Sequence, residues 1–380
     1  MAPDRDMHLP VTALLPLLYI LQLCAGDVST TEEDYDYNTT ITPNYNNYEI
    51  ECSKSDVRKF SAWFLPAMYT LVCLVGLLGN SLVMLTYIYF KRLKTMTDLY
   101  LLNLALADII FLFTLPFWAF SVARYWAFGD FCKVANCIYK MSFFSGMLLL
   151  MLISLDRYFA IVQAASAHRH RSRALFIGKL SCIFIWVLAF FLSIPDLIHS
   201  EVLGAKDKPV RCTITSNNIQ SFIANLKISQ MVIGFLIPLL VMSFCYSQII
   251  KTLLQARNFE KYKAIKVIIA VVIVFVVFQL PYNTVLLVKT ISSFNSNQNC
   301  EASKRLDIAE DITKSLACFR CCLNPFLYAF IGIKFRNDLF KLLKELGCLS
   351  QEQLMQWSTC KQHKRTSVAM DTETTTTFSP

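Results

Sequence analysis

Long runs of apolar residues, separated by short polar segments, make up most of this chain. Seven runs contain roughly 20 residues or more, which is the length that a helix needs to cross the hydrocarbon core of a bilayer. The seventh run is the least apolar, because Lys314 and Arg320 lie inside it. The pattern predicts seven membrane-spanning helices, at residues 60–90, 99–123, 134–162, 174–196, 226–254, 264–291 and 307–333.

The composition also favours a membrane protein. Of the 380 residues, 55% are hydrophobic and 17% are charged, and a soluble domain could not keep so much apolar surface out of water. Residues 334–346 are basic and amphipathic, which predicts a short helix on the membrane surface. The expected fold class is an all-α seven-transmembrane-helix bundle with this surface helix. Cys348 follows it, and both a palmitoylated and an unmodified thiol are considered there.

The two ends of the chain form separate segments. The apolar run at residues 14–23 is too short to span a membrane, follows Arg5 and precedes Ala25 and Gly26. This favours a cleaved signal peptide at 1–26 over a disordered apolar start. We expect an acidic extracellular segment at 27–59, the bundle with its surface helix at 60–345, and a cytoplasmic regulatory tail at 346–380.

Basic residues are concentrated in alternate loops, at residues 91–94, 169–173 and 257–263, and again after the seventh run. By the positive-inside rule, this distribution places the N-terminus outside and the C-terminus in the cytoplasm. Most of the net charge of +9 then faces anionic lipid, so a nucleic-acid partner is not expected. The glycosylation sequon at Asn38 falls on the predicted outer side.

Topology sorts the 14 cysteines by compartment. Four lie at the predicted outer surface, and four cysteines allow three pairings. Cys132 begins the third run, and Cys212 lies in a loop that should fold back over the bundle. Cys52 and Cys300 precede the first and seventh runs, which are neighbours in a closed ring. We predict the bridges Cys132–Cys212 and Cys52–Cys300, with free buried thiols as the alternative.

Ionisable and amide side chains at membrane depth are costly, so each needs a partner or a role. Asn80, Asp108, Asn324 and Tyr328 fall inside apolar runs, where they could meet through water. Prolines inside runs free a backbone carbonyl and permit kinks; they are Pro116, Pro195, Pro238, Pro281 and Pro325. A static polar cluster with fixed kinks would explain any one of these residues equally well.

The series of motifs is more specific than any one of them. In chain order, the seven runs carry Gly79-Asn80, residues 104–108 (Leu-Ala-Leu-Ala-Asp), Asp156-Arg157-Tyr158, Trp186, Pro238 with Tyr246, Pro281, and residues 324–328 (Asn-Pro-Phe-Leu-Tyr). Over residues 60–345 this series resembles the rhodopsin-like G-protein-coupled receptors. Residues 114–118, 126–129 and 156–162, with the extra Cys52/Cys300 pair, resemble the chemokine receptors. Residues 87–98, 163–171, 254–260 and 374–380 are most similar to one C–C member of that family.

The resemblance implies that Arg157 reaches an inhibitory-class heterotrimeric G protein once the sixth helix swings outward. The same activation machinery includes Asp108, Asp156, Tyr158, Tyr246, Pro281, Asn324 and Tyr328. The inner end of the sixth run, at residues 260–263, is basic on balance, so we expect Asp156 to restrain Arg157 in a weak inactive-state latch. Gln279 stands where the family commonly has tryptophan, which puts the usual aromatic switch in doubt.

Gly146 and Arg320 depart from the family's usual sodium-site pattern. Arg320 precedes Asn324 by one helical turn and shares its face of the helix. We therefore expect Arg320 to pair with Asp108 in place of a sodium ion. Solvation of Arg320 by other polar groups or carbonyls is the alternative.

Ligand capture is expected to begin with the acidic N-terminal segment. Residues 27–51 contain seven acidic residues and no Lys or Arg, which suits a basic protein partner, a C–C chemokine by resemblance. Tyr35 and Tyr37 lie among the acids, the context favoured for tyrosine sulfation, and sulfates would add acceptors for the ligand's Arg and Lys. A merely solubilising segment is the alternative.

A second contact is expected in a pocket between the outer halves of the helices. By family position and depth, the candidates are Tyr69, Trp118, Tyr139, Lys140, Asp311 and Lys314. The aromatic residues would pack a flexible chemokine N-terminus, and Asp311 would take its amine. Helix packing is the alternative for each aromatic residue, and a pair with Lys314 or solvation at the rim is the alternative for Asp311. No cofactor or metal is expected.

The tail ends in a run of hydroxyl residues beside Asp371 and Glu373. Once phosphorylated by receptor kinases, this run would suit the basic groove of arrestins. The candidate acceptors are Thr372, Thr374, Thr375, Thr376, Thr377 and Ser379.

Other classes of protein fit less well. The sequence has no nucleotide-binding glycine loop, metal-ligand cluster or nucleophile–base set, so an enzyme is not expected, and the internal repeats of a transporter are not found. The serious rival is an atypical receptor that scavenges chemokine without activating a G protein, against which the intact Asp156-Arg157-Tyr158 argues. The finer resemblance implies homeostatic lymphoid-tissue chemokines and directed migration of lymphocytes and dendritic cells.

Overall fold

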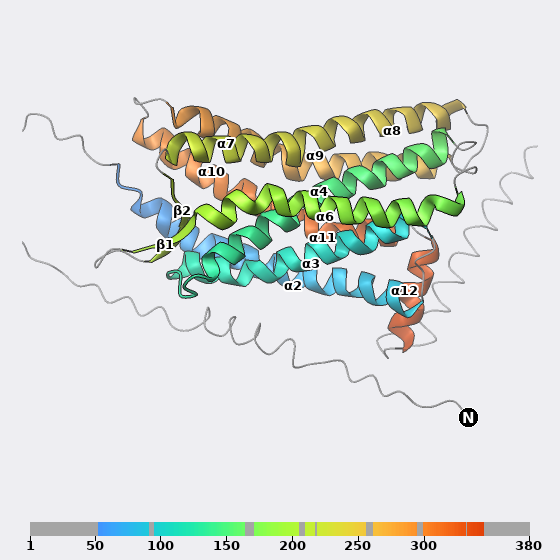
Figure 1. Ribbon diagram of the computed structural model, residues 1–380, viewed down its shortest axis with the longest axis horizontal. Coiled ribbons are helices and arrows are strands. Elements are labelled where there is room, and N and C mark those ends of the chain that lie inside the picture. The colour runs from blue at the N-terminus through green and yellow to red at the C-terminus, as the bar shows by residue number, and fades with distance from the viewer. Residues whose placement is uncertain are drawn as a thin grey trace, which may run out of the picture.

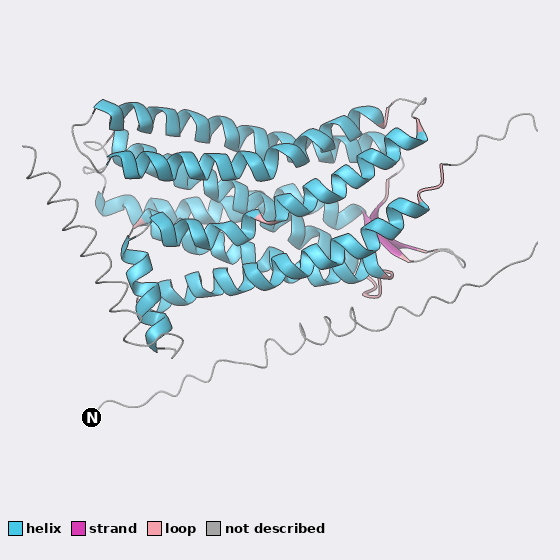
Figure 2. Ribbon diagram, turned by 180° about the vertical axis from the view of Figure 1, so that it is seen from behind, coloured by secondary structure: helices cyan, strands magenta, loops and turns pink. Residues whose placement is uncertain are grey.

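A computed structural model describes residues 52–90, 95–163, 171–204, 210–216, 219–255, 261–294, 299–331 and 333–345. Long helices lie side by side along the molecule, and a short strand hairpin lies at one end, which we call the hairpin end (Figure 1). α12 (Ile333–Glu345) crosses the opposite end, the α12 end, as both views show (Figures 1 and 2). The predicted signal peptide, acidic segment, Cys348 and regulatory tail lie outside the described residues.

The helical elements follow the predicted spans; each begins three to seven residues earlier than predicted, and each ends within three residues of the predicted end. They are α2 (Ser55–Tyr89), α3 (Met96–Ala123), α4 (Phe131–Val162), α6 (Arg171–His199), α7 (Ile219–Met231), α8 (Ile237–Gln255), α9 (Lys261–Ser292), α10 (Cys300–Cys318) and α11 (Arg320–Ile331). A π-helical turn, Val232–Leu236, joins α7 to α8, so the fifth predicted span is one continuous helical segment.

Six segments of the described chain are long and apolar enough to cross a membrane. They are Ser55–Tyr89, Met96–Ala123, Phe131–Val162, Ala174–His199, Ile219–Gln255 and Val272–Ser292. The seventh predicted span instead forms α10 and α11, which are separated at Phe319. Lys314 and Arg320 make this segment less apolar, yet it packs against α2 and α9 and completes the bundle.

Polar residues fix where two of the helices begin. The Thr95 hydroxyl accepts a hydrogen bond from the Asp98 amide at 3.1 Å, and the Asp98 carboxylate accepts one from the Thr95 amide at 3.0 Å. This capping box satisfies free amides at the start of α3. The Asn299 side chain accepts from the Glu301 amide at 3.1 Å and starts α10 in the same way.

Close approach of the backbones holds α2 against α11. A Cβ atom added at Gly79 would lie 2.9 Å from Cγ of Pro325, so only glycine lets the two helices come this near. Pro325 lies inside α11, and Pro116, Pro195 and Pro281 also lie inside helices, as predicted.

A two-stranded hairpin caps the bundle, and disulfides anchor this end. β1 (Ser200–Leu203) pairs antiparallel with β2 (Arg211–Ile214), with Val202 opposite Cys212. The structure contains both predicted bridges: Cys132–Cys212 joins β2 to α4, and Cys52–Cys300 joins the residues before α2 to α10. The sequence pattern does not predict the strands, because four residues each are too few for a clear alternation of apolar and polar positions.

Candidate functional site

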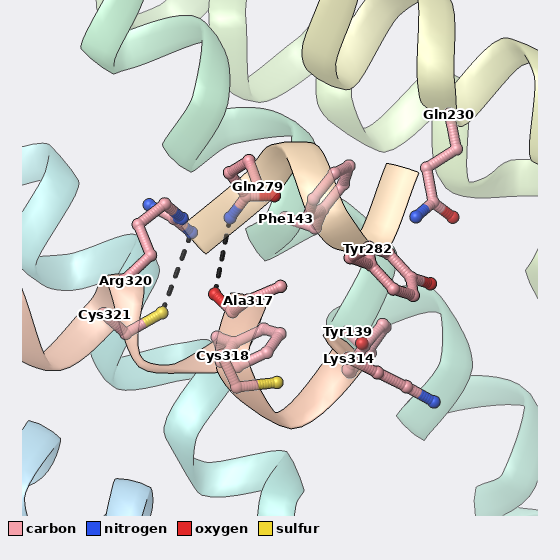
Figure 3. A pocket seen from close by; sticks show the side chains of 11 residues that line it. Tyr139, Phe143, Gln230, Gln279, Tyr282, Lys314, Ala317, Cys318, Arg320 and Cys321 are labelled. Atoms are coloured by element: carbon pink, nitrogen blue, oxygen red, sulfur yellow. Dashed lines mark hydrogen bonds between the residues drawn. The ribbon is translucent and has the colours of Figure 1, made fainter. Parts of the chain in front are cut away.

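A cavity opens within the bundle among α3, α4, α7, α9, α10 and α11 (Figure 3). It contains about 350 Å³ of empty space, part of which is open to solvent. Its wall combines aromatic rings, amides, thiols and two cationic groups, from Phe111, Tyr139, Phe143, Gln230, Gln279, Tyr282, Lys314, Ala317, Cys318, Arg320 and Cys321. This mixture of an apolar wall with a few polar groups is typical of a ligand site.

Tyr139 and Lys314 are the two predicted ligand residues that line this cavity. The Lys314 ammonium lies 5.8 Å from the centre of the Tyr139 ring, a cation–π contact. Trp118 packs edge-on against Tyr139 with the ring centres 6.2 Å apart, and Tyr69 is only 3% exposed in the same cluster of side chains. Tyr69 and Trp118 therefore belong to the cluster that packs with Tyr139 and do not line the cavity themselves.

The other two predicted ligand residues lie beside the cavity. Lys140 donates a hydrogen bond to the side-chain carbonyl of Gln230, which does line it. Asp311 accepts a hydrogen bond of 2.5 Å from the Ser61 hydroxyl. The described residues contain no ion pair between Asp311 and Lys314, so the alternative of a mutual pair is not what the structure shows.

An ion-pair network, not predicted from the sequence, ties three helices together at the hairpin end. Asp307 lies 2.7 Å from the Lys54 ammonium and 2.5 Å from the Lys289 ammonium, and Lys289 also pairs with Glu310. Lys54 precedes α2, Lys289 lies in α9, and the two acids lie in α10. The sequence shows charges of both signs near the ends of different spans. This pattern does not indicate which acid forms an ion pair with which lysine.

The centre of the bundle holds a buried charge pair. Nη1 of Arg320 lies 3.5 Å from Oδ1 of Asp108, with the side chains 5% and 1% exposed. Asn324 donates to the other Asp108 oxygen at 2.5 Å, and Asn80 donates to the backbone of α11 at 3.0 Å. A Cβ atom added at Gly146 would lie 3.2 Å from the Arg320 guanidinium, so the glycine provides space for it. The expected pairing of Arg320 with Asp108 is therefore present.

Near the α12 end, Arg157 is held by its own neighbour. Its guanidinium lies 3.1 Å from the Asp156 carboxylate. The Thr97 hydroxyl, at the start of α3, accepts from Arg157 and donates to Asp156. Arg157 is nevertheless 46% exposed. This arrangement matches the expected restraint by Asp156, and it adds Thr97, for which the sequence offered no signal.

Three more of the predicted activation residues lie in α8 and α9. Tyr246 receives a hydrogen bond of 2.9 Å from Ser154 on α4. Gln279 is buried and donates to the Ala317 carbonyl at 3.3 Å, so it links α9 to α10 just before the break at Phe319. Pro281 lies in α9, two residues after Gln279. The Tyr328 side chain lies outside the described part of the structure, as do Tyr35, Tyr37, Asn38 and the tail hydroxyls.

Comparison with known proteins identifies the architecture. Residues 79–328 match the family model described as "7 transmembrane receptor (rhodopsin family)". The chain is 62% identical to the human C-C chemokine receptor type 7 over 380 residues, which cover 99% of this chain and 100% of that protein. This chain belongs to the chemokine-receptor branch of the rhodopsin family. The resemblance and the fold class predicted from the sequence are thereby confirmed.

More distant members of the branch match most of the chain as well. The human C-C chemokine receptor type 9 is 47% identical over 336 residues, covering 86% of this chain and 88% of its own length. The human C-C chemokine receptor type 6 is 43% identical over 335 residues, covering 86% and 89%. As a member of this family, the chain is a multi-pass membrane protein and a receptor, not an enzyme.

Proposed function

We propose that this chemokine-receptor family member binds basic C–C chemokines at its hairpin end and passes the signal to an inhibitory-class heterotrimeric G protein at its α12 end. The observation that carries the proposal is the arrangement of two sites in one bundle. The cavity is lined by Lys314 of α10, the helix that also carries Asp307 and Glu310 of the hairpin-end network, whereas the restrained Arg157 lies in the last turns of α4. The buried Asp108–Arg320 pair stands between them.

The hairpin end is proposed to face the outside of the plasma membrane. Both disulfides lie at this end, and disulfides persist in oxidising compartments. The basic loops at 91–94, 169–173 and 257–263 favour a cytoplasmic location for the α12 end. This orientation places the Asn38 sequon and the acidic segment outside, and the C-terminal tail inside.

Binding is proposed in two stages. The acidic segment, with Tyr35 and Tyr37 sulfated, attracts the basic body of the chemokine. The chemokine N-terminus then enters the cavity, where Tyr139 packs against it and the Asp311 carboxylate receives its amine. Asp311 accepts one hydrogen bond in the structure and retains capacity for more.

Signalling is proposed to end through the tail. Receptor kinases phosphorylate residues 372–379, and arrestins bind the resulting anionic run. Similarity to C-C chemokine receptor type 7 over nearly the whole chain supports homeostatic lymphoid-tissue chemokines as ligands, and directed migration of lymphocytes and dendritic cells as the outcome.

A panel of C–C chemokines on cells that express the full chain tests this function. Suppression of cyclic AMP and recruitment of arrestin are measured together for each chemokine. We expect at least one chemokine to produce both responses. Arrestin recruitment without suppression of cyclic AMP would contradict G-protein signalling and favour a scavenger. Silence across the panel at normal surface expression would overturn the proposal.

A further inference from the structure

The ammonium of Lys314 is a charge inside the bundle without a carboxylate beside it. It projects from α10 on the cavity side (Figure 3) and contacts the Tyr139 ring. Within the described residues, no Asp or Glu oxygen lies within 4.0 Å of its nitrogen. A cation–π contact compensates less for lost hydration than a carboxylate does, so this group favours an incoming anion.

The neighbouring acids are already engaged by other groups. Glu310, one turn before Lys314, pairs with Lys289, and Asp307 pairs with both Lys289 and Lys54. The Asp311 carboxylate accepts from the Ser61 hydroxyl. Each of these three acids therefore has another partner, and none of them forms an ion pair with Lys314.

A second lysine adds to the positive potential of the same region. Lys140 donates to the neutral side chain of Gln230, which lines the cavity next to Tyr282. The buried Asp196 lies within electrostatic range of Lys140, as do Lys227 and Lys314. Glu310 and Asp311 also lie within electrostatic range of Lys314, but Glu310 is paired with Lys289 and Asp311 accepts from Ser61, so neither forms an ion pair with Lys314.

Asp311 and Lys314 lie three residues apart on α10, and such residues have Cβ atoms about 5–6 Å apart on one side of a helix. The α10 surface therefore offers a negative and a positive group at neighbouring positions. An extended chain advances about 3.3–3.6 Å per residue. A ligand whose terminal amine reaches Asp311 can bring a carboxylate to Lys314 only if that acid lies close to its N-terminus.

We propose that Lys314 forms an anion subsite in the cavity that selects chemokines with an aspartate or glutamate among about their first four residues. This inference rests on the proposed function and refines it. The acidic N-terminal segment recognises the basic body of the ligand, whereas the cavity recognises an acid at the ligand's tip. The two requirements are opposite in sign and act on different parts of the same chemokine.

The test uses the chemokine that gives the strongest cyclic AMP response on the wild-type chain. Its early acidic residues are changed to the matching amides, which preserves shape and removes charge. On the wild-type receptor, we expect the amide form to lose about ten- to hundredfold in potency, as the loss of a charged hydrogen bond implies. On Lys314→Met we expect the natural and amide forms to be equally weak, because the shared contact is already absent. Lys314→Arg should restore most of the difference between the two forms.

Lys133→Met is the matched control, since Lys133 is an exposed lysine in the first turn of α4. This variant should preserve the full difference between the two ligands. Equal potency of the natural and amide forms on the wild-type receptor overturns the subsite, even if Lys314→Met fails to reach the surface. A strongest activator without any early acid overturns it as well, while the proposed function stands. If no chemokine of the panel produces a response, both the subsite and the proposed function are overturned.

Discussion

At the scale of the residue, one guanidinium determines how charge is balanced at the centre of the bundle. Arg320 and Asp108 are both buried, and Asn324 donates to the same carboxylate. Gly146 leaves the space that the guanidinium fills. A buried ion pair contributes little net stability compared with an apolar pair, but removing one partner leaves an uncompensated charge.

Replacement of Arg320 tests this arrangement. Arg320→Gln should lower the stability of the purified receptor by about 3–5 kcal/mol, because Asp108 then keeps a buried charge without its partner. The melting temperature in detergent measures the effect. Adding Asp108→Asn to the variant should recover much of the loss. A melting temperature of Arg320→Gln equal to that of the wild type would show that the Asp108–Arg320 pair does not contribute to stability.

Sodium dependence gives an independent prediction at the same residue. Because the Arg320 guanidinium already neutralises Asp108, exchange of sodium for a bulky organic cation should leave agonist affinity unchanged. Radioligand competition at constant ionic strength measures this. A strong shift in affinity with sodium would mean that the guanidinium does not replace the ion.

At the scale of the element, α10 is fixed to its neighbours by both covalent and ionic contacts. The Cys52–Cys300 bridge and the Lys54–Asp307 pair join its first turns to the residues before α2, and Lys289 joins it to α9. The bridge therefore holds Cys52, at the start of the described chain, against α10, the helix that also lines the cavity. Such tethering raises the effective concentration of one binding site near the other.

Loss of this tether should weaken ligand binding more than it weakens the bundle. We expect Cys52→Ser, Cys300→Ser and the double variant to lose chemokine affinity equally, by at least about tenfold. The other bridge, Cys132–Cys212, should remain intact, so surface expression provides the control for folding. Additive losses in the double variant would contradict a role as one shared bridge.

A second contact between elements joins α3 to α4 near the α12 end. Thr97 accepts from Arg157 and donates to Asp156, so its hydroxyl stabilises the restrained form of Arg157. Thr97→Val should raise ligand-independent signalling by roughly two- to tenfold, the effect of losing about 1 kcal/mol from one state. Thr97→Ser keeps the hydroxyl and should behave as wild type. Equal basal signalling in both variants would exclude the hydroxyl from the latch.

At the scale of the whole molecule, the membrane makes much of the architecture predictable. Helices are required to satisfy the backbone in lipid, so apolar run length alone locates six of the spans. The side of the membrane leaves four cysteines able to pair in three ways, and the expected closed ring, in which the first and seventh helices are neighbours, selects the two bridges. Because Arg320 and Asn324 share a face of one helix, the spacing suggests a pair with Asp108 but leaves solvation by other polar groups open, and the structure shows the pair.

What the sequence does not predict depends on how helices are rotated and placed beside one another. The Lys289–Asp307–Glu310 network joins residues of α9 and α10 that no local pattern pairs. The break at Phe319 and the link from Gln279 to the Ala317 carbonyl arise from packing between α9 and α10. Tyr69 and Trp118 likewise support the cavity wall instead of lining it, which family position alone could not determine.

The structure shows Arg157 bound to Asp156, and we propose a second arrangement of the bundle that releases Arg157 toward a G protein. Guanine-nucleotide exchange on an inhibitory-class G protein, driven by an activating chemokine, tests this claim most directly. With Arg157→Gln at wild-type surface expression, we expect retained chemokine binding and nucleotide exchange reduced to the level without ligand. Exchange at the full wild-type rate would contradict it.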